Sequence, residues 1–163
     1  MLKKVKIKIL TDRAKAAVGL FEGKFAPLAA ANESEHSEMS VLGRYHDDGT
    51  RVSISYDESE LSGMEGSHAT IAYQKAEPEI VSMLRTGSVK TALLFEAGRR
   101  HECVYQTPLA PFDVCVQTNA VRNALETMGT LDLDYIVELK GAEPEHTRMR
   151  IILSPDYDKP QGV

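Results

Sequence analysis

The sequence predicts an all-β protein in which antiparallel strands form one domain. Its 163 residues match the usual length of a single domain. Apolar residues alternate with polar residues in one segment after another, which is typical of strands with one buried face. No long helical pattern separates these segments, so the helical crossovers of a parallel sheet are not expected.

Ten segments are predicted to be strands, and turn-forming residues separate them. Consecutive strands joined by short turns favour an antiparallel meander that takes in residues 1–163. In chain order the ten segments are residues 5–9, 39–45, 51–56, 68–73, 80–84, 89–95, 101–107, 112–117, 131–138 and 149–153.

The first segment, residues 5–9, alternates apolar residues with lysines. The pattern indicates a half-buried strand whose outer face carries Lys4, Lys6 and Lys8. Lysines in this arrangement often protect an edge strand from unwanted pairing, which is the role we expect for them. Because the whole chain has a net charge of −5, we expect no nucleic-acid partner.

Three segments do not fit the alternating pattern. Residues 14–32 predict an irregular or short helical insertion. Residues 119–128 predict either one helix or a bulged continuation of the preceding strand. Residues 155–163 predict a frayed C-terminal tail.

The turn between residues 45 and 52 has a specific signature. Asp48-Gly49 favours a two-residue type I′ turn, because both of its central residues need positive φ. Such a turn places Tyr45 opposite Val52 and keeps the apolar residues of both strands on one face.

The hairpin over residues 80–95 is expected to turn at Thr86-Gly87. In this register one side is formed by Ile80, Ser82, Leu84, Val89, Leu93 and Phe95. The outer side is then also apolar, with Val81, Met83, Ala92 and Leu94, and Arg85 points outward as well. Such an outer face needs a cover, either residues 14–31 or a second copy of the chain.

Cys103 and Cys115 flank the turn at residues 108–111. One register places them directly opposite each other, as a cross-strand disulfide requires; another pairs Cys103 with Val116 and sends the thiols to opposite faces. We favour the second, since it gathers the apolar residues on one face. The N-terminus has no signal-peptide pattern and no apolar stretch is long enough to span a membrane, so we expect a cytoplasmic protein with free thiols and no membrane partner.

No motif for nucleotide binding, nucleophilic catalysis or paired cysteines occurs in the sequence. His101 and Cys103 share one strand face, but a zinc ion needs three or four ligands and no further ligand is evident. We therefore expect no metal, no cofactor and no catalytic residue.

Four tyrosines lie on the apolar phase of their strands, together with His101. If the sheet closes, their hydroxyl groups converge on an aliphatic interior, which is the composition of a ligand pocket. The predicted ligand-binding residues are Tyr56, Tyr73, His101, Tyr105 and Tyr135.

Five short motifs follow one another in a distinctive order. They cover residues 54–58, 81–87, 94–98, 105–108 and 129–135. In their order and spacing the chain, over residues 41–153, resembles the YwiB-like family of uncharacterised bacterial proteins, which carry a domain of unknown function. The resemblance implies an antiparallel closed β-barrel of eight to ten strands with a lipocalin-like (calycin) core. Closure also removes the two edges that an open ten-stranded sheet would expose.

Three functions are compatible with these observations. The first is a non-enzymatic cytosolic barrel that binds a small apolar or amphipathic ligand in its lumen. The second is a protein-interaction or homodimerising module that acts through the outer face of the hairpin at residues 80–95. The third is a small hydrolase or isomerase that uses His101, which requires a carboxylate within hydrogen-bond reach of that ring.

Overall fold

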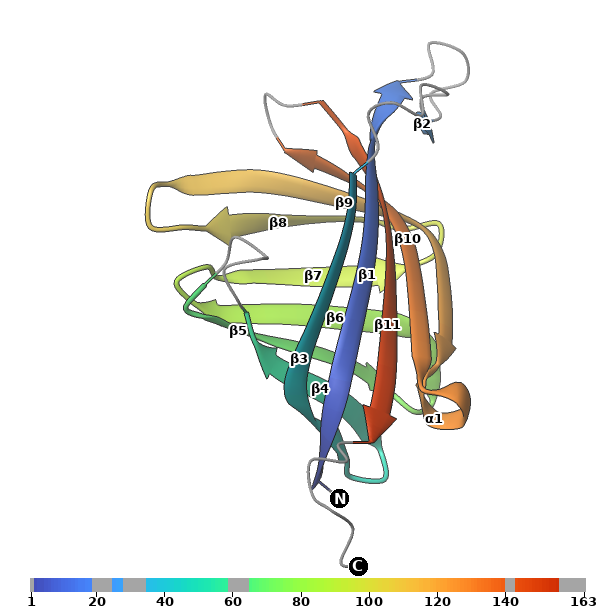
Figure 1. Cartoon of the computed structure of the whole chain (residues 1–163). Helices are drawn as coiled ribbons and strands as arrows, with labels where there is room; N and C mark the ends of the chain where they lie inside the picture. The colour runs from blue at the N-terminus through green and yellow to red at the C-terminus, as the bar shows by residue number, and fades with distance from the viewer. Residues whose placement is uncertain (1, 19–24, 28–34, 59–64, 140–142, 156–163) are drawn as a thin grey trace, which may run out of the picture.

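The computed structural model describes residues 2–18, 25–27, 35–58, 65–139 and 143–155. These residues form eleven strands and one short helix (Figure 1). The elements are β1 (Leu2–Val18), β2 (Phe25–Pro27), β3 (Glu35–Asp47), β4 (Arg51–Asp57), β5 (Ser67–Gln74), β6 (Glu77–Gly87), β7 (Thr91–Glu96), β8 (Arg100–Gln106), β9 (Pro111–Ala124), α1 (Leu125–Met128), β10 (Thr130–Leu139) and β11 (Glu145–Pro155).

Ten of these strands form a nearly closed antiparallel barrel, in the order β7-β6-β5-β4-β3-β1-β11-β10-β9-β8. The first and last strands of this order, β7 and β8, meet through one backbone bridge, with N–O distances of 2.8 and 2.9 Å between Lys90 and Gln106. In Figure 1, β3, β1, β11 and β10 run steeply across the front, and β5 to β8 lie behind them at a large angle. The predicted antiparallel all-β barrel is therefore confirmed.

Each of the ten predicted segments overlaps one barrel strand. Val5, Ile7 and Ile9 are buried while Lys4 and Lys6 are exposed, so the alternation of the first strand is correct. The edge-protecting role of its lysines is wrong, because β1 lies between β3 and β11 and is not an edge.

The prediction of an irregular or helical segment over residues 14–32 is wrong for its described part. β1 continues as a strand to Val18, and β2 at Phe25–Pro27 pairs with it. Pairing with β11 extends β1 to Lys15 and pairing with β2 covers Ala16 to Val18, so partner strands maintain the ladder despite the weak apolar pattern of these residues. The remainder of that segment, and the predicted tail beyond Pro155, lie outside the described residues.

Residues 119–124 continue the preceding strand, and residues 125–128 form a short helix, so each of the two predicted alternatives holds for one part of the segment. β9 runs to Ala124, with a register irregularity opposite Asp134 and Tyr135, and α1 follows. Gly129 ends α1 in the left-handed region at φ 71° and starts the next strand. Leu125 of α1 is buried in the core at the lower end of the barrel as drawn in Figure 1.

The turn between β3 and β4 is shifted by two residues from its prediction. Tyr45 lies opposite Ile54, not Val52. The Asp48 N–H donates to the Arg51 carbonyl at 3.2 Å, so the tip is Gly49-Thr50. The Asp48 carboxylate accepts the N–H groups of Thr50 and Arg51 at 2.9 and 2.7 Å, which favours this tip. A shift of two leaves every side chain on its predicted face.

The β8–β9 hairpin is shifted in the same way. Cys103 lies opposite Val114 and Cys115 opposite Glu102. The two thiols are on opposite faces and both are free, so the prediction of unpaired cysteines is confirmed although the exact partners differ.

The predicted register of the β6–β7 hairpin is wrong. Met83 lies opposite Leu93 and Arg85 opposite Thr91, with residues 86–90 as the loop. Val81, Met83 and Arg85 therefore point inward, whereas Leu84 and Leu94 are 49% and 38% exposed on the outer face. The loop is longer than a two-residue turn because it packs on the start of β5: the Val89 N–H donates to Ser67 Oγ at 2.9 Å.

Large apolar side chains fill the middle and lower part of the lumen. Phe95 stacks at a tilt on Tyr135, with ring centroids 4.7 Å apart. The largest fully buried side chains are Phe95, Ile7, Ile54, Ile71, Met83, Leu131, Leu133, Ile151, Val52, Val81, Val116 and Thr118.

Candidate functional site

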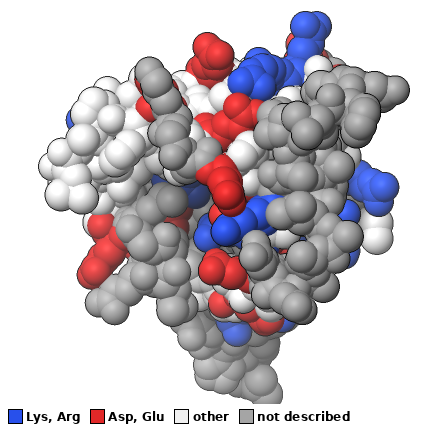
Figure 2. All heavy atoms as spheres, turned by 90° about the horizontal axis from the view of Figure 1, so that it is seen from above, with Lys and Arg blue, Asp and Glu red and all other residues white. Residues whose placement is uncertain are grey.

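Five polar side chains gather at the upper end of the lumen, and we name them the upper lumen cluster. Tyr56 ends the inner face of β4, Glu58 follows it, and Arg85 lies near the end of β6. The cluster is completed by Tyr105 of β8 and Tyr135 of β10. Figure 2 views the molecule from above and shows Lys or Arg and Asp or Glu side chains side by side near the middle of that face.

The position of Arg85 follows from the register of three neighbouring strands. Tyr56 lies opposite Ala69 of β5, and Ala69 lies opposite Arg85 of β6. Ala69 is fully buried and has only a methyl group, so the larger side chains on its two sides can approach each other above it. The Glu58 N–H donates to the Ser67 carbonyl at 2.9 Å, which holds the carboxylate at this height.

Arg85 and Glu58 form a buried ion pair. The Arg85 Nε–H donates to Glu58 Oε1 at 2.9 Å, and the two side chains are 9% and 1% exposed. Burial tends to lower the pKa of Arg85, but Tyr105 and Glu58 outweigh it and the pKa is raised. The guanidinium is therefore charged at any physiological pH.

The three tyrosines of the cluster are neutral. Burial raises the pKa of Tyr56, and the nearby Glu58 raises it further. Burial also raises the pKa values of Tyr105 and Tyr135, although Arg85 and Arg13 act in the opposite direction on both. The cluster thus combines one buried ion pair with three protonated hydroxyl groups beside the apolar core.

Of the five predicted ligand-binding residues, Tyr56, Tyr105 and Tyr135 lie together. Tyr73 is at the lower end, where its hydroxyl donates to Glu126 Oε2 at 3.1 Å. His101 is on β8 beside the open side of β7, and its Nε2 lies 3.3 Å from the Ala92 carbonyl oxygen.

Sequence reasoning missed Arg85 and Glu58. Arg85 shares its alternating phase with Val81 and Met83, and Glu58 shares its phase with Tyr56. A charge on an otherwise apolar phase was therefore visible in the sequence, but the wrong register for β6 and β7 placed Arg85 outside the barrel.

His101 and Cys103, which share one face of β8, lie beside the gap between β7 and β8. Thr91 Oγ1 lies 3.8 Å from Cys103 Sγ. Burial raises the pKa of the Cys103 thiol, so it is a poor nucleophile. Among the described residues, His101 bonds to a carbonyl and no carboxylate bonds to its ring.

The lower end of the barrel is closed by an ion network. Lys75 Nζ lies 2.7 Å from Asp47 Oδ2 and 3.3 Å from Glu126 Oε1. Together with the Tyr73 hydroxyl, this network holds α1 against β3 and β5. The polar groups of this network bond to one another, so we assign them a structural role.

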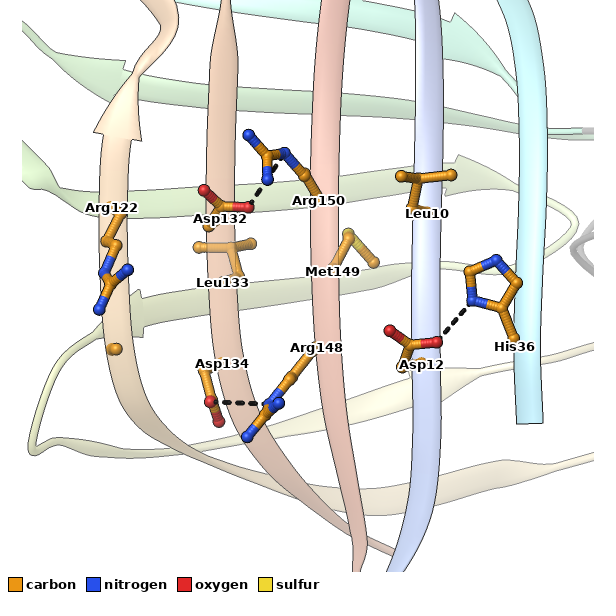
Figure 3. Close-up of a pocket in the computed structure, with 11 residues that line it drawn as sticks. Leu10, Asp12, His36, Arg122, Asp132, Leu133, Asp134, Arg148, Met149 and Arg150 are labelled. Carbon is orange, nitrogen blue, oxygen red and sulfur yellow. Dashed lines mark hydrogen bonds and ion pairs between the residues drawn. The ribbon is translucent and has the colours of Figure 1, made fainter. Parts of the chain in front are cut away.

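A polar hollow of about 490 Å³ lies on the outer face of β9, β10, β11, β1 and β3 (Figure 3). Positive and negative side chains alternate across these strands and pair with each other: Arg150 Nε lies 3.6 Å from Asp132, and Arg148 Nε lies 3.4 Å from Asp134. Asp134 also lies 2.5 Å from His146 Nε2. Such cross-strand ion pairs stabilise a sheet face, so the hollow is explained without a ligand.

No group of three or more His, Cys, Asp or Glu side chains in the described ranges is arranged to hold a metal ion. Within the same ranges, no helix has the length and apolar character needed to cross a bilayer.

The fold and the upper lumen cluster define a class: a nearly closed antiparallel β-barrel with a buried charged group at one end of its interior. The chain belongs to the family described as domain of unknown function (DUF1934), whose model matches residues 28–151. The family resemblance found in the sequence is thereby confirmed.

A solved structure shows the same fold. The crystal structure of ywiB protein from Bacillus subtilis superposes with a TM-score of 0.72 over 94% of this chain and 92% of that chain, at 15% sequence identity. No curated protein matches the sequence.

Proposed function

We propose that the protein is a non-enzymatic barrel that binds a small amphipathic ligand at the upper end of its lumen. The observation that carries the proposal is the buried Arg85–Glu58 pair surrounded by three neutral tyrosines. Buried ion pairs are weak contributors to stability, and well-packed apolar residues often replace them without loss. A binding role explains why charge is kept in this interior.

The packing of the lumen supports a small ligand. Fully buried side chains such as Met83 and Phe95 occupy the space below the cluster. Above it, Phe112 lies directly opposite Tyr105 in the β8–β9 ladder and is 46% exposed, although it has the inward phase. An exposed aromatic ring at the rim gives the apolar part of a ligand a surface beside the polar cluster.

Native mass spectrometry of the protein purified from its own host tests this proposal. We expect a bound small molecule that is released on denaturation. A Tyr105→Leu/Tyr135→Leu variant is expected to lose it, and Tyr73→Phe, at the lower end, is expected to keep it. Empty protein from the native host, together with no change in tyrosine fluorescence on adding a small-molecule extract of that host, would refute the proposal.

A second candidate function is an interaction with another copy of the chain through the outer face of β6, β7 and β8. Leu84 and Val104 are 49% and 44% exposed there, and Leu94 is 38% exposed. Leu94 was predicted on this face, whereas Val81 and Met83, also predicted there, are buried inside. Sedimentation at two concentrations tests it, since a Leu84→Lys substitution would shift a dimer to monomer and would leave a monomer unchanged.

The proposal includes a cytoplasmic location in a bacterium. The two free cysteines support a reducing compartment. The fold shared with a Bacillus subtilis protein supports the bacterial source. Among the described residues the His101 ring bonds to a carbonyl oxygen and not to a carboxylate, so our proposal does not include the hydrolase or isomerase alternative.

A further inference from the structure

The guanidinium of Arg85 has more donors than its known partners use. A guanidinium carries five N–H donors in one plane, and its Nε and Nη atoms point to different sides. Glu58 accepts the Nε–H, and Tyr105 is the next group at the guanidinium. Among the described residues no second carboxylate pairs with Arg85, and beside Glu58 only the Tyr105 side chain hydrogen-bonds to it, so further Nη donors are left for other acceptors.

The charges around the Tyr105 hydroxyl favour an anion, whereas Glu58 acts on Tyr56 and Glu145 acts on Tyr135. Arg13, on the inner face of β1, is the second cation near Tyr105 and Tyr135. Its own partner, Glu145, lies at 3.7 Å, longer than a hydrogen bond. At the Tyr105 hydroxyl both guanidinium groups act and no described carboxylate does.

We propose that the upper lumen cluster binds the carboxylate or phosphate group of a small amphipathic acid, with Arg85 as the residue that recognises the charge. This inference rests on the proposed function and specifies its ligand. Two oxygens of the acid accept N–H groups from the Nη edge, the bidentate geometry for which arginine is suited.

The other members of the cluster have distinct roles. Glu58 is a positioning residue, because its bond to Nε orients the guanidinium plane. The protonated hydroxyls of Tyr105 and Tyr135 donate to the remaining oxygens of the acid. Phe112 at the rim contacts its apolar part. The ligand therefore enters with its charged end first and leaves its apolar end at the upper rim.

Three probes of equal chain length test the charge preference: octanoate, octyl phosphate and octanol. The chain has no tryptophan and six tyrosines, three of them in the cluster, so tyrosine fluorescence and calorimetry both report binding. We expect at least one of the two acids to bind at least about tenfold more tightly than octanol, as a charge-assisted hydrogen bond supplies. The difference between the two acids tells a carboxylate site from a phosphate site.

The Arg85→Met/Glu58→Leu variant removes both charges together, so that neither is left buried alone. We expect this variant to bind octanol as the wild type does and to lose the preference for acids. The matched control is Arg100→Met/Glu138→Leu, an ion pair on the outer face with a 3.1 Å separation, which should keep that preference.

Two results would overturn the inference and leave the proposed function standing. One is octanol binding as tightly as both acids to the wild type. The other is an acid preference that survives in the Arg85→Met/Glu58→Leu variant. Failure of all three probes to bind, together with an empty protein in native mass spectrometry, would instead overturn the proposed function and the inference with it.

Discussion

Removing only one member of the Arg85–Glu58 pair should destabilise the barrel strongly. At a separation of 2.9 Å the attraction is about 6 kcal/mol for an effective dielectric constant of about 20. Glu58→Leu removes this attraction and leaves a cation that is 9% exposed with no compensating charge. We expect a loss of about 3–5 kcal/mol in the free energy of unfolding. For a chain of this length, that lowers the melting temperature by about 10 °C.

Urea unfolding of a double-mutant cycle measures the coupling between the two residues. The Glu58→Leu/Arg85→Met variant should unfold within about 1 kcal/mol of the wild type, because the desolvation cost of both charges disappears together with their attraction. The pair Arg100 and Glu138, with 48% and 24% exposed side chains, should couple by less than about 1 kcal/mol. A Glu58→Leu variant as stable as the wild type would show that the charge of Arg85 is not confined to the barrel interior, and the reasoning would fail.

Two further predictions concern the loops and the outer face. Gly87 has φ 101°, and a Cβ there would lie 2.4 Å from the carbonyl oxygen of Gly66. Gly87→Ala should therefore lower the free energy of unfolding, measured in urea, by about 2 kcal/mol or more. The control Gly49→Ala, at φ 92° but with open space around the Cβ position, should lower it by about 1 kcal/mol. Equal losses in the two variants would contradict the clash at Gly87. Burial acts to raise the pKa of Asp134, but hydrogen bonds, first from His146, outweigh it and lower the pKa below 3.8. The folded-state pKa is thus below the unfolded value, so this stabilisation is present above pH 3.8 and is lost as the pH falls through the folded pKa. Asp134→Asn should flatten the fall in stability between pH 5 and pH 3, and an unchanged slope would contradict the prediction.

The inward or outward direction of most side chains could be predicted from the sequence, because alternation has a period of two. The turns at Asp48 and before Pro111 were each displaced by two residues, and their strands kept the predicted faces. An even displacement changes partners and leaves parity intact. For this reason Tyr56, Tyr105 and Tyr135 were correctly expected to point inward.

The exact partners could not be predicted, because they depend on contacts that are distant in the sequence. The loop at residues 86–90 is long because Val89 bonds to Ser67, and Gly87 fits against Gly66. Neither contact leaves a local signal in the hairpin. The direction of Arg85 depended on that loop alone.

The apolar residues that alternate with the same phase as Arg85 nevertheless indicated that Arg85 points inward. The choice of a two-residue turn at Thr86-Gly87 outweighed this indication. Val81 and Met83 are the apolar residues of its phase, and the alternative assignment required both to face solvent. Exposing two large apolar side chains costs about as much as burying one charge that has a partner. Glu58, two positions beyond Tyr56 on an inward phase, was an available partner in the same sequence. In a barrel sequence, two opposite charges that end two inward phases are therefore a better indicator of a buried polar cluster than tyrosines, since a tyrosine such as Tyr73 is satisfied by one neighbour.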